Sequence, residues 1–304
     1  MPAVRYRSRV RERAGPNPGD RTLPASHLGP LLRGAERLWR GLPSPTPRRL
    51  NRIARRLRKD LADPTPRRVE RAARLWPMPP ARIVCIYRFS NHRMVKKLLS
   101  QTGLPATLWA LDRPHPSLAN WTIGEGPGAR LELLNGLTAQ LDAGYLVVTD
   151  DDVTFSRRGL LAAIKVAHHL GMDLAQPAHG PLSRSTYEFN RFKPGILARR
   201  TMFVEQGPVL ILSPTAQRTV LPFPVVDQMG WGVEVHWYAA AAQGLVLGIL
   251  DAIRMTHHGR VGASYNRATA DRSLAKALSS RDITSVFQMQ TVLSVYSAAS
   301  CSLR

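Results

Sequence analysis

The chain contains little cysteine and no long apolar run. Only two of its 304 residues are cysteines, Cys85 and Cys301, which excludes a disulfide scaffold and any zinc site built from several cysteines. No apolar run approaches the roughly 20 residues that a transmembrane helix needs, and the arginine-rich start lacks the apolar segment of a secretory signal. These two absences lead us to expect a cytoplasmic protein, and the 44% of hydrophobic residues predicts a packed core.

Acidic residues are scarce as well. The chain has 21 Asp and Glu against 43 Lys and Arg, which gives a formal charge of +22. Residues 1–78 hold 20 of the basic residues and 6 of the acidic ones, so +14 of that charge lies in the first quarter of the chain. A positive excess of this size attracts polyanions: nucleic acid, anionic lipid or phosphorylated small molecules.

The basic N-terminal region divides into two parts. Residues 1–30, with alternating arginines and a Gly- and Pro-rich stretch, predict a disordered leader. Residues 31–79 predict a basic helical hairpin, because Pro-Thr-Pro-Arg-Arg at 45–49 recurs at 64–68 and Thr-Pro favours a helix start. Its apolar stripe fits two uses: packing on the main domain, or docking of residues 1–78 on an anionic surface at the inner membrane face. Nucleic acid is the less favoured partner, because aromatic residues are not interleaved with the arginines.

Strand-like and helix-like segments alternate after this region. Short β-branched or apolar runs predict strands at 82–87, 106–112, 145–149, 206–212 and 245–251. Helical patterns occupy 94–100, 130–142 and 159–170, and an Ala-rich helix follows residue 234. This alternation predicts an α/β domain over residues 80–265, with a mostly parallel central sheet and helices on both faces, followed by a helical tail over 266–304.

Three consecutive aspartates end the strand at 145–149. In an extended chain Asp150 and Asp152 point the same way, so both can face one ligand beyond the carboxyl end of the strand. Oxygen ligands of this kind suit Mg²⁺ or Mn²⁺. The alternative is an Asp-rich turn that caps the next helix.

The segment 144–153, Gly-Tyr-Leu-Val-Val-Thr-Asp-Asp-Asp-Val, and the Leu-Leu-Asn-Gly-Leu helix before it resemble the core of GT-A-fold glycosyltransferases. In that Rossmann-like family, a helix bearing Arg or Asn precedes a strand that ends in a DxD motif. The resemblance implies Asp152 as principal metal ligand and Asp150 at the metal or the donor ribose. It implies the following further donor-binding candidates: Asp112 at the base or ribose, Arg130 and Asn135 on the helix, and Arg88 and Asp151 beside them.

The second half extends this resemblance through Gly-Trp-Gly-Val-Glu at 230–234 and His-His-Gly at 257–259, which are similar to a branch of glycosyltransferase-like proteins that includes plant members. The resemblance implies Glu234 as catalytic base, with Asp227 as its rival, and Trp231 and Gly232 near the acceptor. It also implies a late metal-binding histidine, for which His257 fits the His-x-Gly spacing better than its neighbour His258.

The function expected from this resemblance is metal-dependent, inverting transfer of a sugar from a nucleotide-diphosphate donor to a hydroxyl acceptor, with Arg199 and Arg200 as candidates to hold the diphosphate. Two alternatives stay open. A nucleotidyltransferase that makes an activated sugar would share the α/β layout and the metal, but residues 88–92 after the first strand lack its Gly-rich loop. A nucleic-acid-binding protein would use the basic arm alone.

Overall fold

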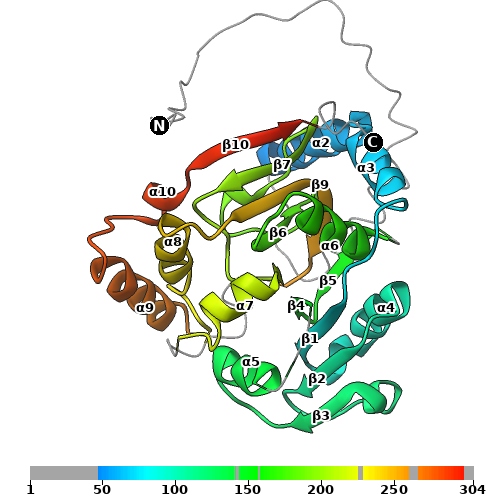
Figure 1. Cartoon of the computed structure of the whole chain (residues 1–304), viewed down its shortest axis with the longest axis vertical. Coiled ribbons are helices and arrows are strands. Elements are labelled where there is room, and N and C mark those ends of the chain that lie inside the picture. The colour runs from blue at the N-terminus through cyan, green and yellow to red at the C-terminus, as the bar shows by residue number, and fades with distance from the viewer. Residues whose placement is uncertain are drawn as a thin grey trace, which may run out of the picture.

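The computed structural model describes residues 47–139, 141, 144–156, 158–224, 229–259 and 266–297, without the side chains of 47–50. The leader expected at 1–30 and the first part of the expected hairpin lie outside these residues. In the described part, ten strands form one sheet in the order β10-β7-β9-β6-β8-β4-β1-β2-β3, and β5 pairs with β9 (Figure 1). The strands are β1 (Ala81–Tyr87), β2 (Ala106–Ala110), β3 (Thr122–Glu125), β4 (Tyr145–Asp150), β5 (Val153–Phe155), β6 (Leu174–His179), β7 (Ile196–Thr201), β8 (Val209–Leu212), β9 (Leu247–His257) and β10 (Val292–Ser297).

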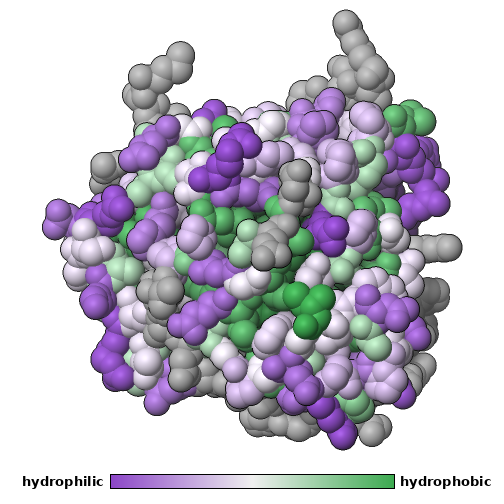
Figure 2. All heavy atoms as spheres, turned by 60° about the horizontal axis from the view of Figure 1, so that its bottom comes forward, coloured by the Kyte–Doolittle hydropathy of each residue, from purple (hydrophilic) through white to green (hydrophobic). Residues whose placement is uncertain are grey.

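Helices cover both faces of the sheet, as the alternating pattern predicts. They are α2 (Pro47–Ala62), α3 (Thr65–Ala72), α4 (His92–Thr102), α5 (Arg130–Thr138), α6 (Gly159–His169), α7 (Pro214–Val220), α8 (Glu234–Ala242), α9 (Arg267–Ser279) and α10 (Val286–Met289). Apolar residues of α3, α4 and α6 share one buried cluster, and those of α5, α7 and α8 share another on the opposite face. The surface in Figure 2 is mostly polar, with apolar side chains gathered near the centre of that view.

The central strands supply both clusters through their alternating side chains. Along β4, Tyr145 and Val147 pack into the cluster of α4 and α6, whereas Leu146 and Val148 pack into the cluster of α5 and α7. A strand covered on both faces is apolar at every position, which explains the uninterrupted run before the aspartates.

The sheet is mixed, although most of its strands run in one direction. The pairs β1–β2, β2–β3, β1–β4 and β6–β9 are parallel. The strands β8, β7 and β5 run against the others, and β8 lies between the parallel strands β4 and β6. The predicted mostly parallel α/β sheet is thereby confirmed, and the reversed strand at its centre is a feature that the sequence pattern does not reveal.

The basic extension folds against the main domain. Val69 and Ala73 of α3 are buried in the cluster of α4 and α6. Arg254 of β9, whose side chain is 10% exposed, is ion-paired with both Asp60 and Asp63 where α2 meets α3. The carboxylate of Asp63 accepts the backbone N–H of Thr65 at 3.0 Å, so this aspartate caps α3 where a threonine cap was predicted. The apolar stripe of α3 therefore packs on the main domain.

The C-terminal tail combines helices with a strand. The helices α9 and α10 pack on α8 through a small apolar cluster that includes Phe203, Val235 and Met289. Residues 292–297 form β10, an edge strand antiparallel to β7. The prediction of helix throughout the tail is therefore wrong for these residues, because pairing with the free edge of β7 outweighs local helix propensity. No helix among the described residues is long and apolar enough to span a bilayer.

Candidate active site

A cavity of about 740 Å³ opens at the carboxyl ends of β1, β4, β6 and β9. Ligands of α/β sheets bind at this edge, because the loops that follow parallel strands meet there. The cavity is lined by eight of the residues expected from the sequence: Arg88, Arg130, Asp150, Asp151, Asp152, Trp231, Glu234 and His257. It is also lined by polar residues that the sequence did not single out, among them His179, Arg184, Tyr187 and Glu205.

One wall of the cavity carries a candidate metal centre. Asp150, Asp152 and His257 each offer one ligand atom, and these atoms all lie within 4.8 Å of one another. His257 Nε2 lies 3.3 Å from Asp152 Oδ1. Burial alone would raise the pKa of Asp152, but the contact with His257 holds it below its ordinary value. The neighbouring His258 turns away and its Nε2 lies 2.9 Å from Thr154 Oγ1, which distinguishes the two histidines.

The middle aspartate of the triplet faces the other way. Asp151 is 6% exposed, and its Oδ2 accepts the backbone N–H of Arg88 at 2.7 Å. Burial raises the pKa of Asp151 to about 6, and the charge of Asp152 adds to the shift. The turn that Asp151 and Asp152 form after β4 thus divides the triplet into two carboxylates at the candidate metal centre and one that holds the loop after β1.

The donor set of this wall fits a divalent cation. Two carboxylates and one imidazole suit Mn²⁺, and also Mg²⁺ where water or phosphate completes the shell. The chain leaves room around these groups by placing glycine next to them. A Cβ on Gly259 would lie 2.2 Å from Asp152 Oδ2 and 3.0 Å from His257 Nε2, and a Cβ on Gly207 would lie 3.3 Å from Asp150 Oδ2. A larger residue at either position would crowd the ligand atoms.

Arg130, the first residue of α5, supplies positive charge beside this centre. Its Nη2 donates to Asp150 Oδ1 at 2.9 Å, and its Nη1 donates to Gln206 Oε1 at 3.4 Å. Asn135 lies one and a half turns further along α5 and does not line the cavity. Its amide forms two bonds with the backbone of Phe223, at 2.8 and 2.7 Å, which fasten α5 to the loop after α7.

Asp112 also lies outside the cavity lining. It is exposed, and its Oδ1 accepts the backbone N–H groups of Phe89 at 2.9 Å and Arg113 at 2.8 Å. The expected diphosphate ligands Arg199 and Arg200 are elsewhere too. Arg199 is 3% exposed and forms a bidentate pair with the buried Asp251, at 2.8 and 3.1 Å.

Another part of the cavity lining carries Glu234, the first residue of α8. Its Oε2 accepts the N–H of Gly232 at 3.1 Å and its Oε1 accepts the N–H of Gln206 at 3.3 Å. Burial raises the pKa of Glu234 to about 7, and the nearby charge of Glu205 acts in the same direction. The rival base Asp227 lies outside the described residues.

The residues of the Gly-Trp-Gly turn before α8 face two different places, the cavity and helix α9. Trp231 lines the cavity, and the guanidinium of Arg267 lies over its ring at 4.5 Å. Gly232 instead faces α9, because a Cβ there would lie 2.6 Å from the Cβ of Ala277. Its φ of 101° also favours glycine. Gly232 is thus required for packing, and its N–H positions Glu234.

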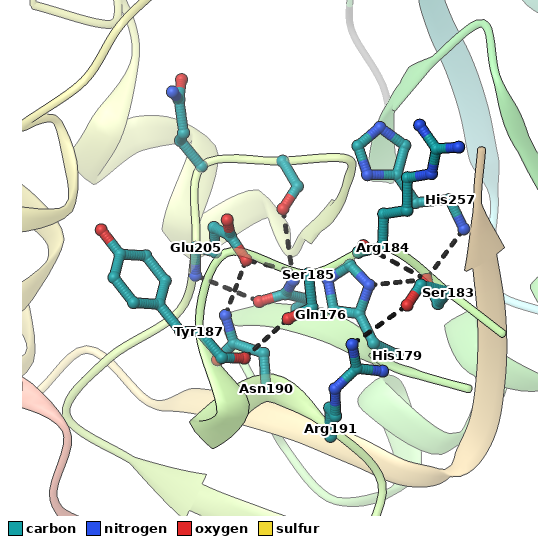
Figure 3. A network of polar contacts seen from close by, with 12 residues as sticks. Gln176, His179, Ser183, Arg184, Ser185, Tyr187, Asn190, Arg191, Glu205 and His257 are labelled. Atoms are coloured by element: carbon teal, nitrogen blue, oxygen red, sulfur yellow. Dashed lines mark hydrogen bonds and ion pairs between the residues drawn. The ribbon is translucent and has the colours of Figure 1, made fainter. Parts of the chain in front are cut away.

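Glu205 and its partners complete this part of the lining and were not found by sequence reasoning (Figure 3). Glu205 Oε2 accepts Nδ2 of Asn190 at 2.8 Å and lies 3.7 Å from Nε2 of His179. Burial and the charges of Glu234 and Glu205 raise the pKa of Tyr187, which lines the same part of the cavity. These residues come from three separate stretches of the chain and share no motif, so only the fold brings them together.

No protein-family model matches the chain, and no curated protein matches it either. Similar solved structures include a crystal structure of GalNAc-T7 with UDP, GalNAc and Mn²⁺, with a TM-score of 0.46 and 8% identity over 66% of this chain and 48% of that one. Residues 1–349 of S. aureus TarS match with a TM-score of 0.42 and 10% identity over 65% and 70% of the two chains. The same TarS fragment in complex with UDP-GlcNAc matches with a TM-score of 0.43 and 10% identity, over 65% of this chain and 71% of that one. The chain thus spans about half the length of the GalNAc-T7 chain that it matches.

Proposed function

We propose that the chain is a metal-dependent glycosyltransferase that moves a sugar from a nucleoside-diphosphate donor to a hydroxyl acceptor, with inversion at the anomeric carbon. The observation that carries the proposal is the cluster of Asp150, Asp152 and His257 at the carboxyl edge of the sheet, in a cavity of about 740 Å³. A cavity of this size matches a ligand as large as a nucleotide sugar. The GT-A resemblance of the segment 144–153 points in the same direction.

The metal-binding wall of the cavity would hold the diphosphate. Asp150, Asp152 and His257 would bind Mn²⁺ or Mg²⁺, which when present offsets the negative charge of the departing nucleoside diphosphate. Arg130 pairs with Asp150 at 2.9 Å and adds a cation that can reach a phosphate oxygen once the donor enters. Arg88 lines the same part of the cavity.

The part of the cavity that carries Glu234 and Trp231 would activate the acceptor. In the reaction the acceptor oxygen forms a bond to the anomeric carbon while the bond from that carbon to the phosphate oxygen breaks. The electron pair of the broken bond leaves with the nucleoside diphosphate, and a carboxylate takes the acceptor's proton. Attack from the side opposite the leaving group inverts the configuration. Glu234 lies in this part of the cavity, and Trp231 offers a ring on which a sugar can stack.

The alternative of a nucleotidyltransferase is less well supported by the loop after β1. Such an enzyme needs free backbone N–H groups there to hold a triphosphate. In this chain the N–H of Arg88 is bonded to Asp151 and that of Phe89 to Asp112. Two carboxylates thus occupy the donors that a triphosphate would require.

Thermal unfolding with nucleotide sugars tests the proposed function. The ligands are UDP-N-acetylglucosamine, UDP-N-acetylgalactosamine and GDP-mannose, each with and without Mn²⁺. We expect at least one donor to raise Tm only when Mn²⁺ is present, because a ligand that binds the folded state stabilises it by mass action. The substitution Asp152→Asn should abolish this metal-dependent shift. A panel in which no donor changes Tm contradicts the proposal.

A basic surface on the extension supports a second, independent role in docking. Arginines 55, 58, 67, 68, 71 and 74 of the α2–α3 region are exposed. Leu61 and Leu75, in the same region, are 65% and 84% exposed. Exposed leucines among arginines suit the surface of an anionic bilayer, where the charge meets headgroups and the leucines enter the interface. Single-stranded nucleic acid would instead require stacking aromatics, and the exposed large side chains of this region are leucines.

A further inference from the structure

Two glutamates line the cavity, and their surroundings differ. Glu205 precedes β8 and Glu234 begins α8, and both line the cavity. The sequence singled out Glu234, because it follows the Gly-Trp-Gly turn. The hydrogen bonds of the two carboxylates show which one can take a proton from an acceptor.

Both oxygens of Glu234 are already engaged with the backbone. They accept the N–H groups of Gln206 and Gly232, and the residue is 6% exposed. These two bonds join the loop before β8 to the turn before α8. Glu234 is therefore placed to hold the wall of the cavity in shape rather than to meet a substrate.

Glu205 keeps one oxygen available. Its Oε2 accepts Nδ2 of Asn190 at 2.8 Å and faces His179, whereas its Oε1 has no hydrogen-bond partner among the described residues. The side chain is 12% exposed and lines the cavity. The backbone N–H of Glu205 donates to Oε1 of Gln176 at 3.0 Å, so the main chain that carries this side chain is held in place.

Two hydrogen bonds and one longer contact lead from the metal-binding wall toward Glu205 (Figure 3). The backbone N–H of His257 donates to Oγ of Ser183 at 2.9 Å, and that oxygen lies 2.7 Å from Nδ1 of His179. The Ser183 hydroxyl also lies 3.4 Å from the carbonyl of Arg184, so its proton is better placed toward His179. Nδ1 of His179 then accepts, and its Nε2 carries the proton and points toward Glu205 Oε2 at 3.7 Å.

The imidazole of His179 is suited to orient a carboxylate. It is 1% exposed, and its Nε2 has no hydrogen-bond partner in the described structure. A buried N–H without a partner is costly, so a small movement that closes the 3.7 Å gap is favourable. His179 and Asn190 would then hold Oε2 of Glu205 from two sides and leave Oε1 for the acceptor.

From this geometry we infer that Glu205 is the catalytic base of the proposed transfer, with His179 and Asn190 as its positioning residues and Glu234 as a support of the cavity wall. The inference rests on the proposed function. The acceptor O–H gives its proton to Oε1 of Glu205 as the acceptor oxygen bonds to the anomeric carbon. The bond from that carbon to the phosphate oxygen breaks, and its electrons leave on the nucleoside diphosphate.

The test compares three isosteric variants, Glu205→Gln, Glu234→Gln and Glu188→Gln. Glu188 is the matched control, because its carboxylate is 69% exposed and pairs with Arg56 and Arg191 outside the cavity. The readout is release of UDP from UDP-N-acetylglucosamine and UDP-N-acetylgalactosamine with Mn²⁺, with water as acceptor, beside the rise in Tm that each donor causes. Water, like a sugar hydroxyl, loses a proton when it attacks the anomeric carbon, so the same base can accelerate its reaction.

We expect Glu205→Gln to lower kcat about 100-fold or more and to keep the donor-induced rise in Tm, since general-base catalysis contributes roughly 10²–10⁴. Glu188→Gln should behave as the wild type. Glu234→Gln should lower kcat by less than about tenfold. It should also lower the Tm of the free protein, because the amide nitrogen of glutamine is a donor and leaves the N–H of Gln206 or Gly232 without an acceptor. His179→Gln should lower kcat at unchanged KM for the donor and shift the acid limb of the pH–rate profile, a change that a purely structural role would not cause.

Unchanged UDP release by Glu205→Gln would overturn the inference. A loss confined to Glu234→Gln would assign the base to Glu234 instead. Loss of the donor-induced rise in Tm by Glu205→Gln would also overturn it, because Glu205 would then be a binding residue. A wild type that binds no nucleotide sugar, or binds one without releasing UDP, contradicts the proposed function itself, and this failure is separate from failure of the Glu205 assignment.

Discussion

Adjacent residues at the end of β4 have opposite surroundings. Asp150 and Asp152 face a polar cavity, where they meet Arg130 and His257, whereas Asp151 between them is buried and bonded to a backbone N–H. The division arises in the turn between β4 and β5, which contains Asp151 and Asp152, and not from the alternation of an extended strand. The adjacent histidines 257 and 258 repeat it at the end of β9, since only the first faces the aspartates.

The two histidines therefore provide a matched pair of variants. We predict that His257→Gln weakens Mn²⁺ binding by at least about tenfold, because one of three clustered ligand atoms is lost. His258→Gln should leave Mn²⁺ affinity within about twofold of the wild type, since His258 bonds Thr154. Titration of Mn²⁺ followed by electron paramagnetic resonance measures both. Equal loss in the two variants would contradict the assignment of His257.

Glu234 should make the stability of the protein depend on pH. Its pKa is raised from 4.5 to about 7 on folding, so the unfolded chain releases this proton at lower pH than the folded protein does. The stabilisation is full below pH 4.5 and is lost as pH rises through 7, at about 1.4 kcal/mol per pKa unit. Denaturant unfolding at pH 5 and pH 8 should show a larger decrease in the wild type than in Glu234→Gln. Equal decreases in the free energy of unfolding of both proteins would show that Glu234 does not cause this pH dependence.

Some single residues were predicted for the site and lie elsewhere. Asn135 has the spacing of a donor-facing residue on α5, but both ends of its amide are bonded to Phe223. Arg199 has the charge for a diphosphate, but Asp251 neutralises it inside the sheet. Residue type and order indicate which groups can do the chemistry, whereas their partners depend on distant segments that fold onto them. For the same reason no motif points to Glu205, His179 or Asn190.

The sequence predicts where most strands and helices lie along the chain, but not the direction in which each strand runs in the sheet. The apolar runs of β1, β4 and β9 and the helices between them were recognisable from periodicity. The reversed direction of β8 was not, because a buried strand is apolar throughout whether its neighbours are parallel or antiparallel. The strand β10 escaped prediction because it depends on pairing with the edge of β7.

Arg254, whose side chain is 10% exposed, provides one of the polar links between the extension and the domain. Arg254 holds Asp60 and Asp63 at the α2–α3 junction, and its guanidinium stacks on the ring of Phe192 at 4.0 Å. We predict that Arg254→Leu lowers the free energy of unfolding by about 2–4 kcal/mol, because the 4%-exposed side chain of Asp63 then loses its cation. Denaturant titration gives the value.

The exposed Arg68 of α3 provides the control for this prediction. Its replacement by leucine should change the free energy of unfolding by about 0.5 kcal/mol or less, as is usual at the surface. Limited proteolysis should also cut the α2–α3 region faster in Arg254→Leu than in Arg68→Leu. A difference of less than about 1 kcal/mol between the two variants would show that the pairs with Asp60 and Asp63 contribute little.

On the scale of the whole molecule, the positive charge has two locations. The cavity carries Arg88 and Arg130 beside its carboxylates, whereas the α2–α3 region carries exposed arginines around Leu61 and Leu75. The arginines of the cavity suit a diphosphate, and those of the α2–α3 region suit the surface of an anionic bilayer. The proposed enzyme would therefore react at one site and dock through another.

Sedimentation with lipid vesicles tests the docking surface. We predict binding to vesicles that contain phosphatidylglycerol, none to pure phosphatidylcholine, and release when salt is raised from about 0.15 M to about 0.5 M, because screening weakens the attraction. Leu75→Ser should reduce binding severalfold. Ile123→Ser is the matched control, since Ile123 is 66% exposed on β3, away from α3 in Figure 1, and should leave binding unchanged. Equal binding by both variants would remove Leu75 from the contact.

The most direct measurement is a crystal structure of the full chain with Mn²⁺ and UDP, recorded at the manganese absorption edge. We expect one strong anomalous peak within coordinating distance of Asp152 and His257, with Asp150 at the metal or one water away, and the diphosphate on the same ion. A peak at another place, or UDP bound away from these residues, would contradict the metal-dependent glycosyltransferase function.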